Sequence, residues 1–424
     1  MSKIGIIGGG AAGYFAAILL GEKGQKDITL IEKNSEPLGK VKISGGGRCN
    51  VTHHLFDPTL LSEKYPRGSK ELKYAFEKFQ PKDMIEWLEK KSVSLKTESD
   101  GRMFPISNSS STIIDCFQKE AKNLGILVLL NTNIESINLT EAKNFLVKTI
   151  DKEFQFDKLL IATGSNKRIW SMLETLGHTI EDVVPSLFTF NIENENLTSL
   201  TGLSVPNAEV KIYPKGKSQL GPVLITHWGL SGPAVLRLSA WEAKEFSKEN
   251  YNLKIKINWL GKISSEEFQN LLLKTKKDFS TKKIYSVSFD FPSRLWNYFL
   301  ELSKVDSEKQ WSSISNSEIH SLKETITNQI LNVTGKGVFK EEFVTCGGIK
   351  RKEINFNTME SKIIPGLYFA GEVIDVDGIT GGFNFQNAWT TAYLASEAMS
   401  VEYYSTSLDL HKYLKSESLI KFEL

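Results

Sequence analysis

The sequence predicts an α/β protein in which a Rossmann-like domain with a parallel sheet is interrupted by an inserted β-barrel-like and helical subdomain. Two apolar runs, at residues 4–7 and 28–31, flank a glycine-rich turn and a small, apolar helix, and the second run ends in Glu32. A change to short alternating runs after residue 187 interrupts this pattern. At 424 residues the chain is long enough for roughly two or three domains.

The glycine-rich turn has the spacing of a dinucleotide-binding loop. Gly8 permits a tight turn off the strand, Gly10 lets backbone approach a pyrophosphate, and Gly13 lets the helix pack closely on the strand. The helix N-terminus then directs free N–H groups at the phosphates. The Glu32 carboxylate can accept hydrogen bonds from an adenosine ribose, and its charge disfavours a 2′-phosphate. The unit predicts a site for FAD or NAD, whereas an ordinary glycine-rich turn would leave Glu32 unexplained.

Composition favours a cytoplasmic protein. The 52 basic and 50 acidic residues give a net charge of +2, so nothing global indicates a nucleic-acid or membrane partner. Cys49, Cys116 and Cys346 are far apart, which suits a reduced protein without disulfides, and no Cys/His cluster indicates a metal. The apolar N-terminus contains loop glycines and lacks a basic leader region, so we interpret it as the first strand and helix of a soluble fold.

A second glycine cluster, residues 45–47, is followed by Arg48, Cys49 and Asn50. Consecutive glycines carry a large entropic cost, so they are expected where backbone lies against a flat or charged ligand; the alternative is a flexible surface loop. Upstream, Lys40 could meet phosphate or remain solvated. Arg48 could bind an anionic group or brace the loop, and Cys49 could be a reactive thiol or a buried packing residue.

Two later strands end in small residues, which let backbone approach a ligand. One strand, residues 159–161, runs into Thr163 and Gly164, and the other, residues 366–370, runs into Gly371 and Glu372. We therefore predict a discontinuous first domain, residues 1–186 and 344–424, with residues 344–349 as the strand that returns the chain to it.

The intervening segment, residues 187–343, is predicted to be the insert. Alternating runs predict a β-barrel-like part over 187–262, and a Lys-rich pattern predicts helices over 263–335. The lysine-rich run 274–283 is typical of a solvated helix face, with an anionic partner as the alternative.

Together these motifs resemble the two-dinucleotide-binding-type flavoprotein superfamily, and within it the aminoacetone oxidase-like or BaiN-like FAD-binding proteins. The resemblance is carried by the stretches GKVKISGGGRCNVTH, GRMFP, LITHWGLSGPAVL and PGLYFAGEVIDVDGITGGFNFQNAW. It implies FAD, bound in an extended form, with an inserted β-barrel over the flavin. Ser165 and Cys346 stand where Gly and Ala are expected, and neither departure touches the cofactor motifs.

The resemblance also implies a cofactor-binding set that draws on every motif. The set comprises Gly8, Gly10, Ala11, Ala12, Gly13, Glu32, Lys33, Lys40, Gly46, Gly47, Arg48, Cys49, Asn50, Ile134, Thr163, Gly164, Gly371, Glu372, Asn384, Phe385 and Gln386. Within it, Glu372 would reach toward the ribitol and the pyrophosphate. The last three residues would open the final helix beneath the flavin, where a helix N-terminus favours negative charge on the reduced ring.

The implied function is that of an FAD-dependent oxidoreductase that transfers a hydride between flavin and a small organic substrate. No second strand–GxGxxG–helix unit provides an NAD(P)H domain, so either NAD(P)H visits the flavin transiently or oxygen reoxidises it. The family includes an amine oxidase and reducers of conjugated C=C bonds, and the sequence does not separate them. A flavin-binding sensor or interaction protein without turnover is the alternative, and the oligomeric state stays open.

His227 is the candidate catalytic residue. It lies in the insert's THWGLSGP stretch, at a strand end before a predicted helix, and the resemblance brings this stretch toward the flavin. Histidine titrates nearest neutral pH, so His227 could be a general acid or base, or equally a structural hydrogen-bonding residue. His53 and His54 are interpreted as ordinary loop residues.

Overall fold

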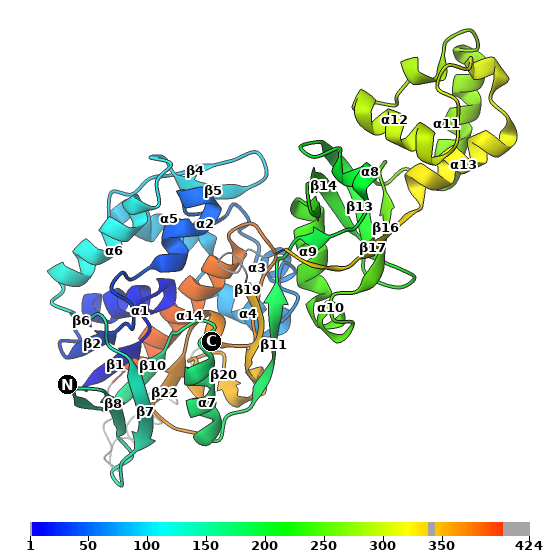
Figure 1. Cartoon of the computed structure of the whole chain (residues 1–424). Coiled ribbons are helices and arrows are strands. Elements are labelled where there is room, and N and C mark those ends of the chain that lie inside the picture. The colour runs from blue at the N-terminus through cyan, green and yellow to red at the C-terminus, as the bar shows by residue number, and fades with distance from the viewer. Residues whose placement is uncertain (1, 338–343, 402–424) are drawn as a thin grey trace, which may run out of the picture.

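The computed structural model describes residues 2–337 and 344–401, which form two lobes with separate hydrophobic cores (Figure 1). The larger core draws its residues from positions 4–173 and 349–399, joined by Ala240. The smaller core draws its residues from positions 188–333. We propose that residues 1–186 and 344–424 form one domain and that residues 187–343 form the insert. The end of the insert at residue 343 and the segment 402–424 lie outside the described residues.

The larger lobe, called the first domain below, is built on a seven-stranded sheet with the order β20-β21-β22-β10-β1-β2-β6. Its strands are β1 (Ile4–Ile7), β2 (Ile28–Ile31), β6 (Leu127–Leu129), β10 (Lys158–Ile161), β20 (Ile354–Asn355), β21 (Glu360–Ser361) and β22 (Leu367–Phe369). The strands from β22 to β6 are parallel. Every residue of β1, β2 and β10 is buried, as expected for parallel strands covered on both faces. The predicted α/β class is confirmed.

Three helices cover one side of this sheet: α1 (Ala11–Glu22), α6 (Ser111–Asn123) and α14 (Phe383–Ser400) (Figure 1). On the other side lies a three-stranded antiparallel sheet of β7 (Ile134–Leu139), β8 (Phe145–Thr149) and β9 (Glu153–Phe156). A Cβ at Gly5 would collide with the Phe156 ring, so the glycine in β1 allows this sheet to pack closely against the parallel sheet. Lys158 donates hydrogen bonds of 2.9 Å and 2.6 Å to the carbonyls of Met399 and Val401, which anchors the C-terminal end of α14.

A helical region with one small antiparallel sheet lies beside α14. Its elements are α2 (Gly39–Gly47), β3 (Thr52–His53), α3 (Pro58–Ser62), α4 (Ser69–Phe76), α5 (Pro81–Lys90), β4 (Leu95–Thr97) and β5 (Arg102–Pro105). Pro81 begins α5, where Gln80 and Asp83 form a capping box.

Two antiparallel strands connect the lobes: β11 (Ile180–Ser186) leaves the first domain and β19 (Val344–Ile349) returns to it. The sequence predicts β19 as a returning strand, but β19 pairs with β11 and not with the parallel sheet. The reason is that Gly347 and Gly348 have positive φ angles and lie against the backbones of residues 181–182 and 373–375, a close approach that suits a connecting ribbon.

The insert contains a seven-stranded antiparallel sheet with the order β17-β16-β13-β14-β15-β12-β18. These strands are β12 (Phe190–Asn191), β13 (Ser204–Ile212), β14 (Gln219–Thr226), β15 (Gly229–Ser231), β16 (Leu253–Asn258), β17 (Gln329–Val333) and β18 (Gly335–Lys336). Short helices α8 (Glu195–Thr198), α9 (Pro233–Trp241) and α10 (Ala243–Lys248) accompany the sheet.

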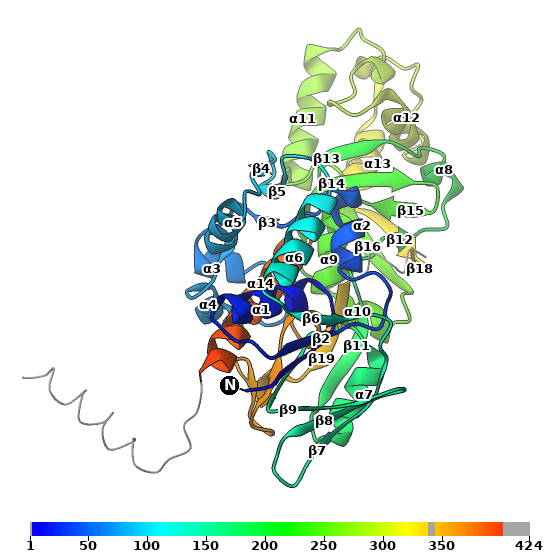
Figure 2. The ribbon, with the colours of Figure 1, turned by 90° about the vertical axis from the view of Figure 1, so that its left-hand side faces the viewer.

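A helical tip lies at the end of the insert away from the first domain (Figures 1 and 2). It consists of α11 (Ser265–Asp278), α12 (Ser293–Leu302) and α13 (Asn316–Thr327), with single turns η1 (Ile284–Ser286) and η2 (Trp311–Ser313). The sequence predicts helices to residue 335, but the helical part ends at Thr327. The chain returns to the sheet as β17, in which Gln329, Leu331 and Val333 are buried and the residues between them are exposed. This alternating segment has only five residues and directly follows α13, so it was not recognised as a strand.

Within the described residues, no helix is long and apolar enough to cross a membrane. In the same part of the chain, no cluster of three His, Cys, Asp or Glu side chains could hold a metal ion.

Candidate cofactor-binding and active site

The first glycine turn joins the ends of β1, β2 and β10. Gly8 has φ +108°, and its N–H donates to the Ile31 carbonyl at 2.8 Å. A Cβ at Gly8 would collide with the Ala162 carbonyl, and one at Gly13 would collide with the Gly8 carbonyl. By contrast, a Cβ at Gly10 would meet nothing within 4 Å. Gly8 and Gly13 are therefore required by packing, whereas Gly10 borders open space at the N-terminus of α1.

Glu32 lies at the end of β2, where it is only 8 % exposed. Its Oε2 accepts from the Gly9 N–H at 2.7 Å and its Oε1 accepts from the Asn34 N–H at 2.8 Å. Each carboxylate oxygen has more than one lone pair, so both can still accept from a further hydroxyl. The backbone contacts fix the orientation of the carboxylate toward the glycine turn.

A cavity of about 60 Å³ adjoins Glu32. Lys33, Ile134 and Thr163 line it, as do Asn166 and Arg168, which sequence reasoning missed. The buried Thr163 Oγ1 has no hydrogen-bond partner among the described residues, which suits a polar ligand there. Gly164 follows with φ +58°.

Asn166 caps α7 (Lys167–Thr175) by accepting from the N–H groups of Arg168 and Ile169 at 3.1 Å and 3.4 Å. The signal that could have found these residues is an N-cap Asn directly after the strand that ends in Thr163 and Gly164. A larger, shallow hollow of about 520 Å³ lies beside β6 and α6, but none of the predicted residues lines it.

The second glycine cluster is a kink at the end of α2. Gly45, Gly46 and Gly47 all have positive φ angles. A Cβ at Gly45 would press on Phe104 at 2.8 Å, whereas a Cβ at Gly46 or Gly47 would meet nothing within 4 Å. Gly46 and Gly47 therefore border open space, as Gly10 does.

The residues after this kink hold it in place. Arg48 Nη1 donates to Glu98 Oε1 at 2.6 Å and its guanidinium lies 4.0 Å from the Phe104 ring centroid, so Arg48 braces the loop against the β4–β5 hairpin. Cys49 is fully buried, and burial raises the pKa of its thiol to about 12. Asn50, with its amide oriented to satisfy both atoms, accepts from the Gly382 N–H at 2.9 Å.

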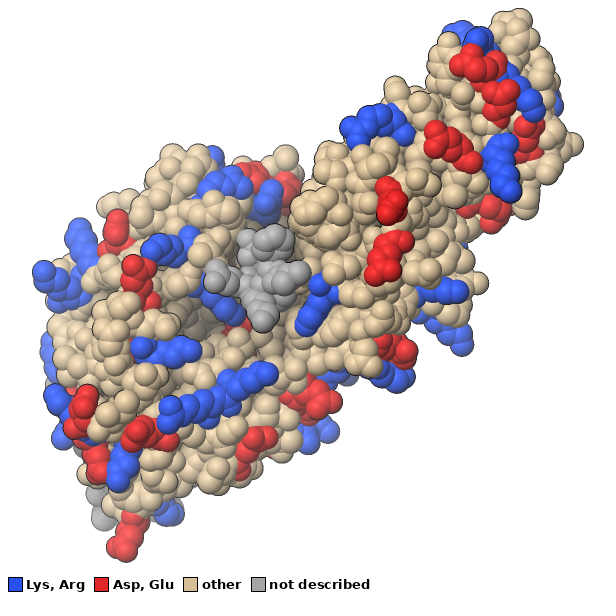
Figure 3. Space-filling model, viewed as in Figure 1, with Lys and Arg blue, Asp and Glu red and all other residues tan. Residues whose placement is uncertain are grey.

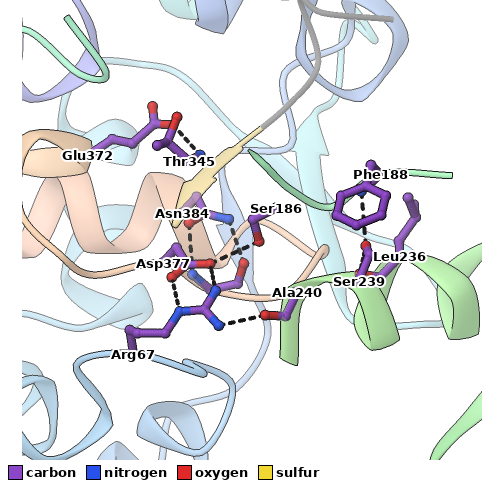
Figure 4. Close-up of polar contacts among 11 residues, drawn as sticks. Arg67, Ser186, Phe188, Leu236, Ser239, Ala240, Thr345, Glu372, Asp377 and Asn384 are labelled. Atoms are coloured by element: carbon purple, nitrogen blue, oxygen red, sulfur yellow. Dashed lines mark hydrogen bonds and ion pairs between the residues drawn. The ribbon is translucent and has the colours of Figure 1, made fainter. Parts of the chain in front are cut away.

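Glu372 connects the end of β22 to two other segments. Its Oε1 accepts from the Thr345 N–H at 2.8 Å (Figure 4), and its Oε2 pairs with Lys40 Nζ. Gly371, with φ +76°, donates its N–H to Thr391 Oγ1 at 2.9 Å. The contacts bring Lys40 and Glu372, two predicted site residues, to one edge of the parallel sheet.

The predicted residues at the start of α14 hold the preceding loop. Asn384 accepts from the Gly378 N–H at 2.8 Å and donates to the Gly378 carbonyl at 2.9 Å. The buried Gln386 accepts from Thr52 Oγ1 at 2.6 Å. The Phe385 ring stacks on Trp389 with centroids 5.7 Å apart. The two amide side chains are thus engaged within the protein, and the backbone N–H groups of the first turn remain available for a ligand.

A buried ion pair, missed by sequence reasoning, ties this loop to both lobes (Figure 4). Arg67 Nε donates to Asp377 Oδ1 at 2.5 Å, and Arg67 Nη2 pairs with Asp377 Oδ2. Ser186 Oγ donates to Asp377 Oδ2 at 2.9 Å, and Arg67 Nη1 donates to the Ala240 carbonyl of α9 at 2.6 Å. Burial raises the pKa of Asp377, against the opposing effect of Arg67. The sequence signal that could have revealed this ion pair is an acidic residue, Asp377, within a glycine-rich loop.

His227, the predicted catalytic candidate, and His53, interpreted as an ordinary loop residue, differ in their surroundings. His227 is exposed in the turn between β14 and β15, edge-on to the Trp228 ring with centroids 4.4 Å apart. His53 contacts the glycine-rich loop, because its Nδ1 lies 3.0 Å from the Gly381 carbonyl and its ring stacks on Phe383 at 4.6 Å. Burial lowers the pKa of His53. The sequence interpretation of His53 as an ordinary loop residue therefore missed its contact with this loop.

The model of the HI0933-like protein Rossmann domain matches residues 2–398. The chain belongs to this family. Among curated proteins, it is 26 % identical over 418 residues to the 3-dehydro-bile acid delta(4,6)-reductase of Clostridium scindens, covering 94 % of this chain and 99 % of that protein. It is 30 % identical over 404 residues to the ribosomal RNA dihydrouridine synthase of Escherichia coli, covering 92 % of this chain and 96 % of that protein.

Among solved structures, the 3-ketosteroid-delta4-(5alpha)-dehydrogenase of Rhodococcus jostii RHA1 superposes with a TM-score of 0.51 at 12 % identity, over 95 % of this chain and 97 % of that one. This likeness concerns the fold alone. The family membership confirms the predicted resemblance, and the chain is a flavin-dependent oxidoreductase with a Rossmann-type domain.

The described residues fit an extended flavin dinucleotide. Gly10 in the first glycine cluster and Gly46 and Gly47 in the second each border open space, because a Cβ there would meet nothing within 4 Å. The unpartnered Thr163 hydroxyl and the spare lone pairs of Glu32 supply polar contacts at the nucleotide end.

Proposed function

We propose that this chain is an FAD-dependent reductase that saturates a carbon–carbon double bond conjugated with a carbonyl group, with NAD(P)H as the reductant. The observation that carries the proposal is similarity over nearly the whole length to two reductases whose names share one reaction. A Δ4,6-reductase of a 3-keto steroid acid hydrogenates a double bond conjugated with the ketone. Dihydrouridine is uridine with two hydrogens added to the ring C=C bond beside a carbonyl.

In this proposal, FAD is bound by residues at the ends of β1, β2, β10 and β22 and by the second glycine cluster. Gly8, Gly10 and the first N–H groups of α1, at Ala11 and Ala12, would hold the pyrophosphate, and Glu32 would accept from the ribose. Lys33, Ile134, Thr163 and Gly164 would contact the AMP half, and Lys40 and Glu372 the pyrophosphate and ribitol. Gly46, Gly47 and the first turn of α14 would border the ring. The bound flavin would supply the hydride chemistry.

The reaction also needs a proton for the second carbon, and we propose His227 as its donor. His53 is the weaker candidate because a carbonyl can only accept, so His53 Nδ1 carries the proton that faces Gly381. With its pKa lowered by burial, neutral His53 then presents Nε2 as an acceptor. His227 is exposed and forms no hydrogen bond with another described residue, so its ring is open to solvent and to a substrate.

The electrons must come from a diffusible donor. Cys49, Cys116 and Cys346 are all buried, and burial raises their pKa values to about 12, about 11 and about 11. Thiols of this kind are poor nucleophiles at neutral pH, so an internal dithiol relay is disfavoured.

We propose that the substrate is a uracil base in RNA, in preference to a conjugated ketone. Two of the relatives, from Escherichia coli at 30 % identity and Haemophilus influenzae at 29 %, are named for dihydrouridine in ribosomal RNA. This departs from the expectation of no nucleic-acid partner, which rested on the net charge of +2. Basic and acidic side chains are mixed over the face seen in Figure 3, so RNA contacts would have to be local.

The test is an anaerobic assay of the purified holoenzyme with NADH or NADPH. Ribosomal RNA from cells that lack the gene and a 4-en-3-one steroid would be offered separately. We expect NAD(P)H-dependent bleaching of the flavin and dihydrouridine in the RNA by mass spectrometry. Flavin that is bleached by simple amines, recovers only with oxygen and reduces neither substrate would overturn the proposal in favour of an amine oxidase.

A further inference from the structure

The helical tip carries an exposed patch that the proposed chemistry leaves unused. We define the tip patch as Lys274, Lys277, Phe279, Lys282 and Tyr285. It runs from the last turns of α11 through the following turn to η1. All five residues are exposed.

The lysines of the patch outnumber its one neighbouring acid within the segment, Asp278, which is exposed between Lys277 and Phe279 in the chain. Lys283, next to the patch, pairs with Glu308, whereas Lys274, Lys277 and Lys282 form no ion pair with a described residue. Lysines in the last turn of a helix are common because they oppose its dipole, which accounts for Lys277 but not for Lys274. Lys282 lies beyond the end of α11 at Asp278, so the helix dipole does not account for it either.

Two aromatic rings lie among these lysines. Phe279 is 38 % exposed and Tyr285 is 47 % exposed. Lys282 Nζ lies 5.0 Å from the Phe279 ring centroid, and Lys283 Nζ lies 5.8 Å from that of Tyr285. Exposed rings beside ammonium groups are the combination on which unpaired bases stack while their phosphates are neutralised.

The turn that carries the patch is held by backbone hydrogen bonds, one within the turn and two to residues 309–311. The Lys282 N–H donates to the Phe279 carbonyl, and the Trp311 N–H donates to the Lys282 carbonyl, both at 2.9 Å. The Ile284 N–H donates to the Lys309 carbonyl at 2.9 Å. A rigid surface loses less entropy when it binds than a mobile lysine-rich loop does.

We propose that the tip patch docks single-stranded or looped RNA, and this rests on the proposed RNA substrate. The tip lies at the end of the insert farthest from the first domain (Figures 1 and 2), so a small substrate at the flavin does not reach it. A structured RNA is large enough to contact both places. The occupant is thus a polyanion with unpaired bases, matched to the lysines and the rings.

The test compares RNA binding by holoenzyme variants, with a fluorescent ribosomal RNA fragment as the probe and salt as a variable. Lys277→Ala/Lys282→Ala should weaken binding about 10–30-fold at 0.1 M salt and reduce the slope of log K against log salt by about 1.5. Phe279→Ala should weaken binding about 5–100-fold with little change in slope. The matched control, Lys248→Ala/Lys262→Ala, removes two exposed insert lysines outside the patch and should bind like the wild type.

NAD(P)H-dependent reduction of a small conjugated ketone, measured in parallel, separates the two proposals. Normal flavin reduction, a normal melting temperature and weaker RNA binding in the tip variants would support docking. Unchanged RNA binding in both tip variants would overturn docking and leave the reductase proposal standing. Wild-type protein that reduces the ketone but binds no RNA would overturn docking and the RNA substrate together. Reduction of neither substrate would instead contradict the reductase proposal itself.

Discussion

The nucleotide end and the flavin end of the candidate site are built in different ways. At the nucleotide end, Gly9 and Glu32 are hydrogen-bonded partners 23 positions apart in the chain. At the flavin end, Thr52 bonds Gln386 across 334 positions and Arg67 pairs with Asp377 across 310. A local motif therefore forms the first region, and tertiary contacts form the second. The difference teaches that the Gly8–Glu32 unit of the nucleotide end is shaped by contacts within one short stretch of chain, whereas the flavin end depends on how distant segments of the first domain assemble.

The largest expected effect comes from Gly10→Val at the nucleotide end. Gly10 borders open space, so valine should leave the apoprotein folded while its methyl groups occupy the approach of the pyrophosphate. We expect loss of the flavin absorbance and, with FAD at about 1,000 times its dissociation constant, loss of about 4 kcal/mol of ligand stabilisation. Flavin content and melting with added FAD measure this. Gly13→Ala should instead fail to fold, because its Cβ would collide with Gly8; normal flavin in Gly10→Val would contradict the comparison.

At the flavin end, Arg67→Ala should lower the free energy of unfolding by about 3–5 kcal/mol, because it leaves the Asp377 carboxylate buried without its cation. Denaturant unfolding gives the value. Lys82→Ala, which removes an exposed partner 3.9 Å from Glu86, should change little. Equal effects of the two substitutions would contradict a special role for the buried pair.

The deficit of Arg67→Ala should also depend on pH. A carboxyl with a raised folded pKa binds more protons in the folded than in the unfolded state, so its contribution falls as pH rises through the folded pKa. Burial already raises the pKa of Asp377, and loss of Arg67 removes the effect that opposes this shift. Unfolding at pH 5 and pH 8 should show the smaller deficit at pH 5. A deficit that grew toward acid would reverse the sign and count against this account.

His227→Ala tests the insert's part in the reaction. Flavin content and the visible spectrum should stay the same, while flavin oxidation by the conjugated substrate should slow by about 10²–10⁴-fold if His227 supplies the proton. Reduction of the flavin by NAD(P)H should keep its rate. His53→Gln is the matched histidine variant, and it should alter the flavin spectrum through the loop that His53 contacts. A normal oxidation rate in His227→Ala would assign it a structural role.

The smallest effect is expected for Cys49→Ala. The Cys49 thiol is buried and its pKa is raised to about 12, so it does not form a reactive thiolate at neutral pH. Turnover should therefore stay within about twofold of the wild-type rate. Iodoacetamide should leave native protein unlabelled and modify all three cysteines after unfolding. Fast native labelling of Cys49, or a large loss of turnover, would restore the reactive-thiol alternative.

The sequence was sufficient for features whose partners are close in the chain. The fold class and the roles of Gly8 and Gly13 in packing follow from local patterns. Arg48 was left open between an anion contact and a brace, and its partner Glu98 lies 50 positions away. Asp377 and His53 were missed because their partners lie 310 and 328 positions away, beyond any periodic signal.

The central claim is that flavin in this protein passes its electrons to a conjugated carbon–carbon double bond. The most direct test reduces the bound flavin with one equivalent of dithionite, without oxygen or NAD(P)H, and then adds uracil-containing ribosomal RNA or a 4-en-3-one steroid. We predict that flavin absorbance returns with one of these substrates, with one saturated product formed per flavin. Flavin that stays reduced with both until oxygen is admitted would contradict the account.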